Sequence, residues 1–185
     1  MINKIPAEIK KALKKLEQHN FEAYLVGGCV RDLIINRPPN DFDIATNAKP
    51  EMIIDIFKEY KAVPTGLKHG TVTISIGKYH IEITTFRCDG TYTDCRRPDS
   101  VTYSSSIYDD LGRRDFTMNS LALNLNNELI DIFNGVEHIN KKIVVCTGNP
   151  EKRFSEDALR ILRAVRFATI LNFNLTPEVY AAIIK

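Results

Sequence analysis

The chain has 185 residues, enough to bury a sizeable core in one domain with room for the start of a second. Hydrophobic residues make up 44% and charged residues 26%, as in ordinary soluble globular proteins, and the net charge of +2 does not by itself indicate a nucleic-acid binder. Four cysteines without Cys-x-x-Cys spacing exclude the usual zinc and redox motifs, and no apolar run is long enough to cross a bilayer. We therefore expect a cytoplasmic protein.

A helix is predicted over residues 5–18, where isoleucines and leucines recur at helical spacing and lysines take the outer side. The apolar run Tyr24–Val26 then predicts a buried strand that ends at Gly27 and Gly28. Two adjacent glycines let a large ligand approach the main chain. A short helix over 30–35 follows, and its first turn offers free N–H groups to an anion.

The first turn of that helix carries Arg31 and Asp32, and Pro38-Pro39-Asn40 ends the helix. In the extended segment that follows, Asp41 and Asp43 project from one face. Paired carboxylates suit Mg²⁺, which binds through one or two carboxylates together with substrate phosphates. A solvated turn explains Asp-x-Asp alone, and a tight bend explains Gly-Gly alone; their combination in this order favours nucleotidyl transfer.

A helix over 51–60 is predicted next, with Met52, Ile53, Ile56 and Phe57 as its buried stripe. Segments 71–76 and 80–86 alternate with the period of strands and are joined across Gly77-Lys78.

In the second of these strands Glu82 lies between two isoleucines and therefore faces away from the core. Residues 88–106 are rich in Ser, Thr, Asp and Gly and predict a loop that is either functional or disordered.

A short helix over 108–114 leads into RRDFTMN, and strands are predicted over 121–125 and 129–133. Residues 135–146 complete a first domain that ends at 148.

Ser155 is predicted as the N-cap of a helix that continues to Leu171. Apolar residues, Leu159, Leu162 and Val165 among them, are expected to cover the sides of this helix that lie outside a polar stripe spaced by three. That stripe is formed by Asp157, Arg160, Arg163 and Arg166, and a solvated face is the alternative reading. A further helix begins at Pro177.

Four motifs together resemble the polymerase-beta-like nucleotidyltransferases, in particular the bacterial-type tRNA nucleotidyltransferases (CCA-adding enzymes) and poly(A) polymerases: GGCVRD, DFD, RRDFTMN and EDALRILRAVRF. The resemblance runs from about residue 24 to 166. It implies an α+β fold: a head of mixed or antiparallel sheet flanked by helices over 1–148, and the start of an all-helical neck over 149–185. Because this family continues into further helical domains, the chain is expected to be truncated.

The resemblance also implies roles for individual residues. Glu82 would complete a catalytic triad with Asp41 and Asp43, and these two aspartates would hold Mg²⁺. The implied nucleotide-binding residues are Gly27, Gly28, Arg31, Asp32, Arg114, Asp115, Asn119, Asp157, Arg160, Arg163 and Arg166.

Within that set, Asp157 and Arg160 would select the base. Cytosine and adenine both present an amino group beside an accepting ring nitrogen, which suits a carboxylate next to a guanidinium. Uracil and guanine would place a carbonyl against the carboxylate and be rejected without a template.

The function expected from these features is CCA addition: transfer of C and A from CTP and ATP to the 3′ end of tRNA by a two-metal mechanism. Poly(A) addition is disfavoured because TGLKHGTVTISI at 65–76 is not arginine-rich and because YTDCRRP at 92–98 matches the CCA-adding loop. A CC-adding or A-adding specialist, a nucleotide- or RNA-binding fragment without activity, and a small-molecule nucleotidyltransferase remain open. No membrane partner is expected, and the oligomeric state is open.

Overall fold

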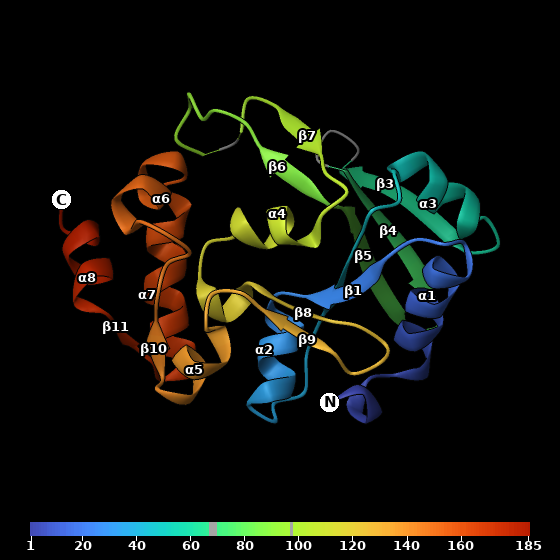
Figure 1. Cartoon of the computed structure of the whole chain (residues 1–185), viewed down its shortest axis with the longest axis horizontal. Coiled ribbons are helices and arrows are strands. Elements are labelled where there is room, and N and C mark those ends of the chain that lie inside the picture. Colours follow the sequence, from blue (N-terminus) through green and yellow to red (C-terminus); the bar gives the residue numbers. More distant parts are fainter. Residues whose placement is uncertain (67–69, 97) are drawn as a thin grey trace.

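A seven-stranded mixed sheet organises the chain, with strands in the order β3-β4-β5-β2-β1-β8-β9 (Figure 1). The structure, a computed structural model, describes residues 1–66, 70–96 and 98–185. β2 and β5 run parallel, and the other neighbours in this sheet run antiparallel. The strands span Ala23–Val26 (β1), Phe42–Thr46 (β2), Lys61–Gly66 (β3), Thr71–Ile76 (β4), Tyr79–Thr85 (β5), Leu121–Leu123 (β8) and Leu129–Asp131 (β9).

Helices and two small sheets surround these strands, so the predicted α+β class is confirmed. The helices are η1 (Ile2–Lys4), α1 (Ala7–Gln18), α2 (Gly28–Ile34), α3 (Pro50–Ile56), α4 (Ile107–Gly112), η3 (Thr117–Asn119), α5 (Gly135–Asn140), α6 (Pro150–Glu156), α7 (Leu159–Leu171) and α8 (Pro177–Ile183). The small sheets pair β6 (Arg87–Asp89) with β7 (Val101–Tyr103), and β10 (Ile143–Val144) with β11 (Asn174–Leu175).

One face of the sheet carries the main hydrophobic core. Alternate residues of the strands, such as Leu25, Ile44 and Ile83, are fully buried there. Helix α1 contributes Ile9 and Leu13 to the same cluster, as its helical spacing predicts. This face therefore supplies most of the hydrophobic stabilisation of the fold.

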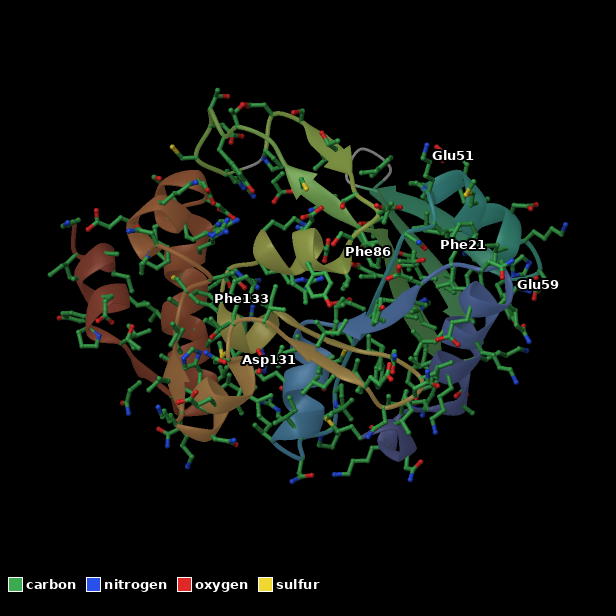
Figure 2. The ribbon with its side chains drawn as sticks, viewed as in Figure 1. Phe21, Glu51, Glu59, Phe86, Asp131 and Phe133 are labelled. Carbon is green, nitrogen blue, oxygen red and sulfur yellow. The ribbon has the colours of Figure 1, made fainter. Side chains whose placement is uncertain are left out.

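The opposite face of the sheet has a thinner cover. A smaller apolar cluster there joins Val26 and Phe86 to Leu111 of α4, and Phe133 packs against it (Figure 2). In the same strands and on the same face, Asp43 of β2 stands directly beside Glu82 of β5. Because side chains alternate along a strand, both carboxylates point away from the main core.

Most predicted elements are confirmed with shifted ends, but the buried stripe of the helix after Pro50 is partly wrong. Met52 is 47% exposed, whereas Ile53, Ile56 and Phe57 are buried. Met52 precedes Ile53 by one residue, and one residue turns the side chain by about 100° around a helix axis. Met52 therefore lies at the edge of the sector that Ile53, Ile56 and Phe57 share, on the side away from Phe57. Helix α3 also ends at Ile56, earlier than predicted.

The single helix predicted from Ser155 to Leu171 is wrong: the segment forms two helices, α6 and α7. Asn149 is the cap of α6, since its side chain accepts from the Lys152 N–H at 3.0 Å. Asp157 has extended backbone angles (φ −145°, ψ 105°) and separates the two helices. Ser155 lies inside α6, where its hydroxyl donates to the Lys152 carbonyl at 2.8 Å.

The apolar cover predicted for this helix is also wrong at three positions. Leu159, Leu162 and Val165 are 42%, 66% and 47% exposed. By contrast Arg160, assigned to the polar stripe, is only 6% exposed. Arg163 and Arg166 are exposed, as the polar stripe predicts, and Ile161 and Phe167 are partly buried against the core.

Residues 88–106 were predicted as a loop without secondary structure, and the structure contains a hairpin there. Strands β6 and β7 pair in antiparallel fashion from Arg87–Tyr103 to Asp89–Val101. The connection between them reaches the break between α6 and α7, where the Ala158 N–H donates to the Cys95 carbonyl at 2.9 Å. The arginine-poor segment 65–76 and the YTDCRRP motif include residues 67–69 and 97, which lie outside the described residues.

Candidate active site

A pocket of about 540 Å³ lies between the sheet and helices α2 and α7. At one end Gly27 has a φ of +76°, which a residue with a side chain rarely adopts. A Cβ atom on Gly27 would also lie 3.1 Å from Nη1 of Arg114 and 4.0 Å from Oδ2 of Asp43. Glycine is therefore required here, because an arginine and a carboxylate converge on the main chain.

Asp43 is half-buried, and it is the least exposed of the three carboxylates. Burial, together with the charges of Glu82 and Asp41, raises the pKa of Asp43 to about 6 against the opposing effect of Arg114. Glu82 is its neighbour across the β2–β5 ladder, and Asp41, directly before β2, is exposed. The three carboxylates thus concentrate negative charge at one place on the open face of the sheet.

The donor set fits a hard divalent cation. Within the described residues no group of three or more His, Cys, Asp or Glu side chains is arranged as a complete metal site. Mg²⁺ does not need one, because it binds through one or two carboxylates and completes its shell with waters and substrate phosphates. Burial and the neighbouring carboxylates both disfavour the charged form of Asp43, and a bound cation would offset both effects.

A second cavity of about 230 Å³ lies beside the first, and Asp43 and Arg114 line both. Its other walls include Glu82, Thr84 and Arg87. Asp43 therefore stands between the two cavities, and Glu82 lines the smaller one.

The floor of the larger pocket is held together by Arg31, which is 6% exposed. Its Nη1 donates to Oδ1 of Asn119 at 2.7 Å, and its Nε and Nη2 donate to Oδ1 of Asp32. The guanidinium also lies over the ring of Phe167, 5.2 Å from the centroid. Through these contacts the guanidinium of Arg31 connects α2, η3 and α7.

A second ion pair crosses the pocket wall. Nε of Arg163 on α7 donates to Oδ2 of Asp115 at 2.6 Å, and the side chain of Asp115 is 9% exposed. Oδ1 of the same carboxylate accepts from the Phe116 N–H. Asp115 is thus fixed from both sides and ties the RRDFTMN segment to α7.

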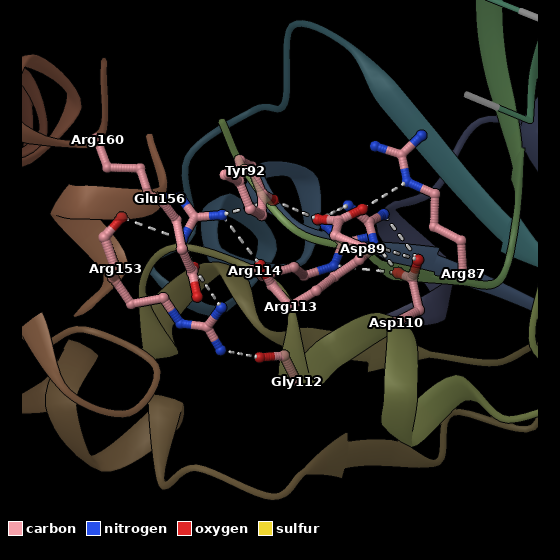
Figure 3. A network of polar contacts seen from close by, with 10 residues as sticks. All are labelled: Arg87, Asp89, Tyr92, Asp110, Gly112, Arg113, Arg114, Arg153, Glu156 and Arg160. Atoms are coloured by element: carbon pink, nitrogen blue, oxygen red, sulfur yellow. Dashed lines mark hydrogen bonds and ion pairs between the residues drawn. The ribbon is translucent and has the colours of Figure 1, made fainter. Parts of the chain in front are cut away.

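The far end of the pocket is formed at the junction of α6 and α7 (Figure 3). Nη1 of Arg160 donates to Oε2 of Glu156 at 2.8 Å, and its Nη2 is 3.5 Å from the hydroxyl of Tyr92 and 3.4 Å from the Arg113 carbonyl. Arg153 donates to the same Glu156 oxygen at 3.0 Å. The guanidinium of Arg160 is therefore held in one orientation by groups from three segments.

Asp157 lines the pocket next to Arg160. Its Oδ1 accepts from the Leu159 N–H at 2.9 Å, so this side chain also caps the first turn of α7. A carboxylate has about four acceptor positions, so the cap leaves acceptors for a ligand. At this end of the pocket the Asp157 carboxylate can accept hydrogen bonds and the Arg160 guanidinium can donate them. The pair therefore complements a ligand edge that has a donor beside an acceptor.

The model of the poly(A) polymerase head domain matches residues 23–145 of the chain. The chain belongs to this family. Its head domain contains the strands β1, β2 and β5 that carry the carboxylates and the segment 113–119 that lines the pocket.

Relatives extend the likeness beyond the head domain. The CCA-adding enzyme of Lactobacillus helveticus is 49% identical over 185 residues, which cover 98% of this chain and 46% of that enzyme. The structure of the CCA-adding enzyme of Bacillus stearothermophilus in complex with CTP superposes with a TM-score of 0.87 at 45% identity, covering 95% of this chain and 42% of that one. A tRNA nucleotidyltransferase complexed with a primer tRNA and an incoming ATP analogue has a TM-score of 0.75 at 30% identity, covering 93% and 48%. The chain spans less than half the length of these relatives.

Of the predicted site residues, ten line the larger pocket of the head domain and its α7 wall: Gly27, Gly28, Arg31, Asp43, Arg114, Asp115, Asn119, Asp157, Arg160 and Arg163. Glu82 lines the smaller cavity, and Asp32 contacts the pocket through Arg31. Asp41 is exposed beside the carboxylates, and Arg166 is exposed on α7, outside both linings.

Sequence reasoning missed several residues that shape the head-domain site. Phe167 and Arg113 line the pocket, and Glu156, Tyr92 and Asp110 hold its arginines. Glu156 adjoins Asp157 in the EDALRILR motif, so the motif already pointed to it. Asp110 precedes Arg113 and Arg114 by three and four residues, whereas Asp109 precedes only Arg113 by four, so the local spacing favours Asp110 but does not show which aspartate is buried.

Within the described residues no helix is long and apolar enough to span a membrane.

Proposed function

We propose that the protein containing this chain adds C and A from CTP and ATP to the 3′ end of tRNA, as a template-independent nucleotidyltransferase. The observation that carries the proposal is one pocket with two chemically different ends. Arg31, Arg114 and the main chain at Gly27 and Gly28 provide positive charge and N–H donors at one end. Asp157 and Arg160 provide one acceptor and one donor group at the other.

The site residues divide the work as follows. The triphosphate lies at the glycine end against Arg31 and Arg114, and the base meets Asp157 and Arg160. The 3′-hydroxyl of the RNA reaches Asp43 from the smaller cavity, whose wall includes Glu82. The hydroxyl oxygen forms a bond to the α-phosphorus while the bond to the departing pyrophosphate breaks, and Glu82 accepts the hydroxyl proton or ligates a metal ion.

Asp41 and Asp43 are the residues that would hold Mg²⁺, with phosphate oxygens of the nucleotide completing the shell. A bound Mg²⁺ supplies charge neutralisation of the triphosphate and lowers the pKa of the attacking hydroxyl. The position of Asp43 beside Glu82, in surroundings that disfavour its negative charge, supports this assignment. We also propose a cytoplasmic location, since the four cysteines are free thiols.

The proposal has support from the relatives named above, one bound to CTP and another to a primer tRNA with an ATP analogue. Base selection follows from the Asp157–Arg160 end: CTP and ATP place an amino group at the carboxylate, while UTP and GTP place a carbonyl there. Each mismatch leaves a buried polar group without a partner, which is costly.

The experiment is extension of tRNA that lacks its last three nucleotides, by the full protein with CTP alone, ATP alone and both together. CCA addition predicts two C residues with CTP alone and the complete CCA end with both. Repeated A residues with ATP alone would identify a poly(A) polymerase, and no extension with any combination would refute the proposal. In the variant Asp41→Ala extension is expected to stop while CTP and ATP still bind without metal; retained extension would refute the metal role of Asp41.

A further inference from the structure

Asp110 on α4 is a charged side chain that lies outside the pocket yet controls two of its residues. The residue is fully buried at 0% exposure. One oxygen, Oδ1, accepts from Nε and Nη2 of Arg113 at 3.1 and 2.7 Å. The other, Oδ2, accepts from Nε and Nη2 of Arg114 at 3.3 and 2.9 Å. One carboxylate thus binds two successive guanidiniums, each through two N–H groups.

This arrangement follows from the spacing of Asp110 and the two arginines along the chain. Arg113 and Arg114 follow Asp110 by three and four residues, the spacing that brings side chains together on a helix. Burial alone would raise the pKa of Asp110, but the Arg114 and Arg113 guanidiniums outweigh burial and hold it below its ordinary value. A buried carboxylate is tolerated here because its charge is fully paired.

Beyond Asp110, the two arginines contact different neighbours. Arg114 lines both cavities, and its Nη1 lies 3.1 Å from the position of a Cβ on Gly27. Arg113 pairs with Asp89 at 3.8 Å, and its carbonyl oxygen lies 3.4 Å from Nη2 of Arg160. Through Arg114 and Arg113, Asp110 is therefore connected to both ends of the pocket.

The neighbouring Asp109 provides the contrast. It is exposed, and its Oδ2 accepts from the Ser104 hydroxyl at 2.5 Å, away from the pocket. Both aspartates lie in the first turn of α4, where negative charge is favourable to the helix. A role limited to the helix end would be shared by both, so the buried position and the two guanidiniums single out Asp110.

We propose that Asp110 is a positioning residue that fixes the guanidinium of Arg114 toward the triphosphate of the incoming nucleotide. An arginine side chain has many rotamers, and holding it in the binding orientation removes the entropy cost of ordering it when the nucleotide arrives. The carboxylate of Asp110 accepts from Nε and Nη2 of Arg114. Nη1 of Arg114 then remains to donate to a phosphate oxygen. This inference rests on the proposed function.

The test is the variant Asp110→Asn in the full protein, with Asp109→Asn as the matched control that removes the same charge from the same helix. Equilibrium binding of CTP and CMP is measured together with the urea midpoint of unfolding. We expect D110N to weaken CTP binding by about tenfold, the size of one hydrogen bond to a charged group. CMP lacks the outer phosphates, so its affinity should fall much less, and D109N should bind both like the wild type.

The outcomes separate three explanations. Equal losses for CTP and CMP would assign Asp110 to general stability and overturn the positioning role. CTP binding by D110N at wild-type affinity would overturn it too, even if the wild type extends tRNA and the proposed function stands. A wild-type protein that neither binds CTP nor extends tRNA would refute the proposed function together with this inference.

A measurement on the wild type keeps the test independent of how well D110N folds. The Nε–H signal of Arg114 in an NMR spectrum of the full protein, assigned with Arg114→Lys, reports whether that N–H is held. We expect slow exchange with water before nucleotide is added, and a shift of the signal when CTP binds. Exchange as fast as that of the exposed Arg166 in the absence of CTP would overturn the proposal.

Discussion

The two faces of the central sheet are made by the same strands but carry different kinds of side chain. On one face Leu25, Ile44 and Ile83 are fully buried against helices and form the main core. On the other, Asp43 and Glu82 stand side by side under a thinner cover. Each strand alternates between the two, so successive residues such as Glu82 and Ile83 belong to different environments.

This difference shows how the fold holds like charges close together. The pKa of Asp43 is raised to about 6, first by burial and then by Glu82, so the carboxylate is kept in a place that does not favour its charge. The apolar face compensates, because its packed side chains fix the register of β2 and β5. Stability is thus concentrated on the apolar face, and the neighbouring carboxylates are held on the other face.

The variant Glu82→Gln tests the carboxylate face of the sheet, and we expect it to have the largest effect. If Glu82 is a catalytic carboxylate, losing its charge should slow nucleotide incorporation by about a thousandfold, the usual range for a general base. Because Glu82 is exposed, the free energy of unfolding should change by about 0.5 kcal/mol or less. Single-turnover extension and urea unfolding measure the two effects. Unchanged incorporation would remove Glu82 from the catalytic group.

Ile83→Ala is the matched change one residue away on the apolar face. Ile83 is 0% exposed in the main core, so we expect a loss of about 2 to 5 kcal/mol in the free energy of unfolding. At a temperature where the variant is folded, incorporation should stay within a few-fold of the wild type. A variant as stable as the wild type would contradict the stabilising role of the apolar face. A variant that is folded yet inactive would contradict the separation of the two faces.

The Asp110 ion pairs extend the comparison to pH. Their carboxylate has a folded pKa below the ordinary value of 3.8, because Arg114 and Arg113 outweigh the opposing effect of burial. Such a group stabilises the fold fully above its unfolded pKa, and the contribution is lost as pH falls through the folded pKa. We expect the stability difference between wild type and D110N to be constant from pH 7 to 5 and to shrink below pH 3.8. A difference that grows on acidification would mean that the carboxylate is not held charged by the arginines.

The reactivity of the four cysteine thiols tests the difference between the interior and the surface of the protein, and it is the smallest of the expected effects. Burial raises the pKa of Cys29 and of Cys146 to about 12, whereas Cys88 and Cys95 are exposed. In the native protein at pH 8 we expect iodoacetamide to modify the two exposed thiols well before the other two, and all four at similar rates in urea. Rapid native modification of Cys29 would show that the β1–α2 region opens readily.

The parts of the site that are local in sequence could be predicted, and the parts that depend on distant segments could not. Gly27, Gly28 and the Asp-x-Asp pair follow from alternation and turn chemistry within one short stretch. The place of Glu82 beside Asp43 follows from strand period together with family resemblance. The break at Asp157 could not be foreseen, because a helical pattern continues across it and the contacts of Arg160 with Tyr92 and Arg113 come from elsewhere in the chain.

The same reasoning explains why Asp110 was missed. Asp109 and Asp110 are identical residues in neighbouring positions, and which one faces the interior depends on how α4 rests on Val26 and Phe86. The domain boundary predicted at 148 stays a prediction. The core runs across that point, since β10 before it pairs with β11 after it.

Nucleotide selectivity is the most direct measure of the central claim, that one pocket joins a phosphate end to a base-reading end. Titration of the protein with CTP, ATP, UTP and GTP by calorimetry compares all four ligands under one condition. The account predicts measurable binding of CTP and ATP and binding of UTP and GTP weaker by about tenfold or more, since each of these leaves polar groups unpaired. Equal affinity for all four nucleotides would contradict it.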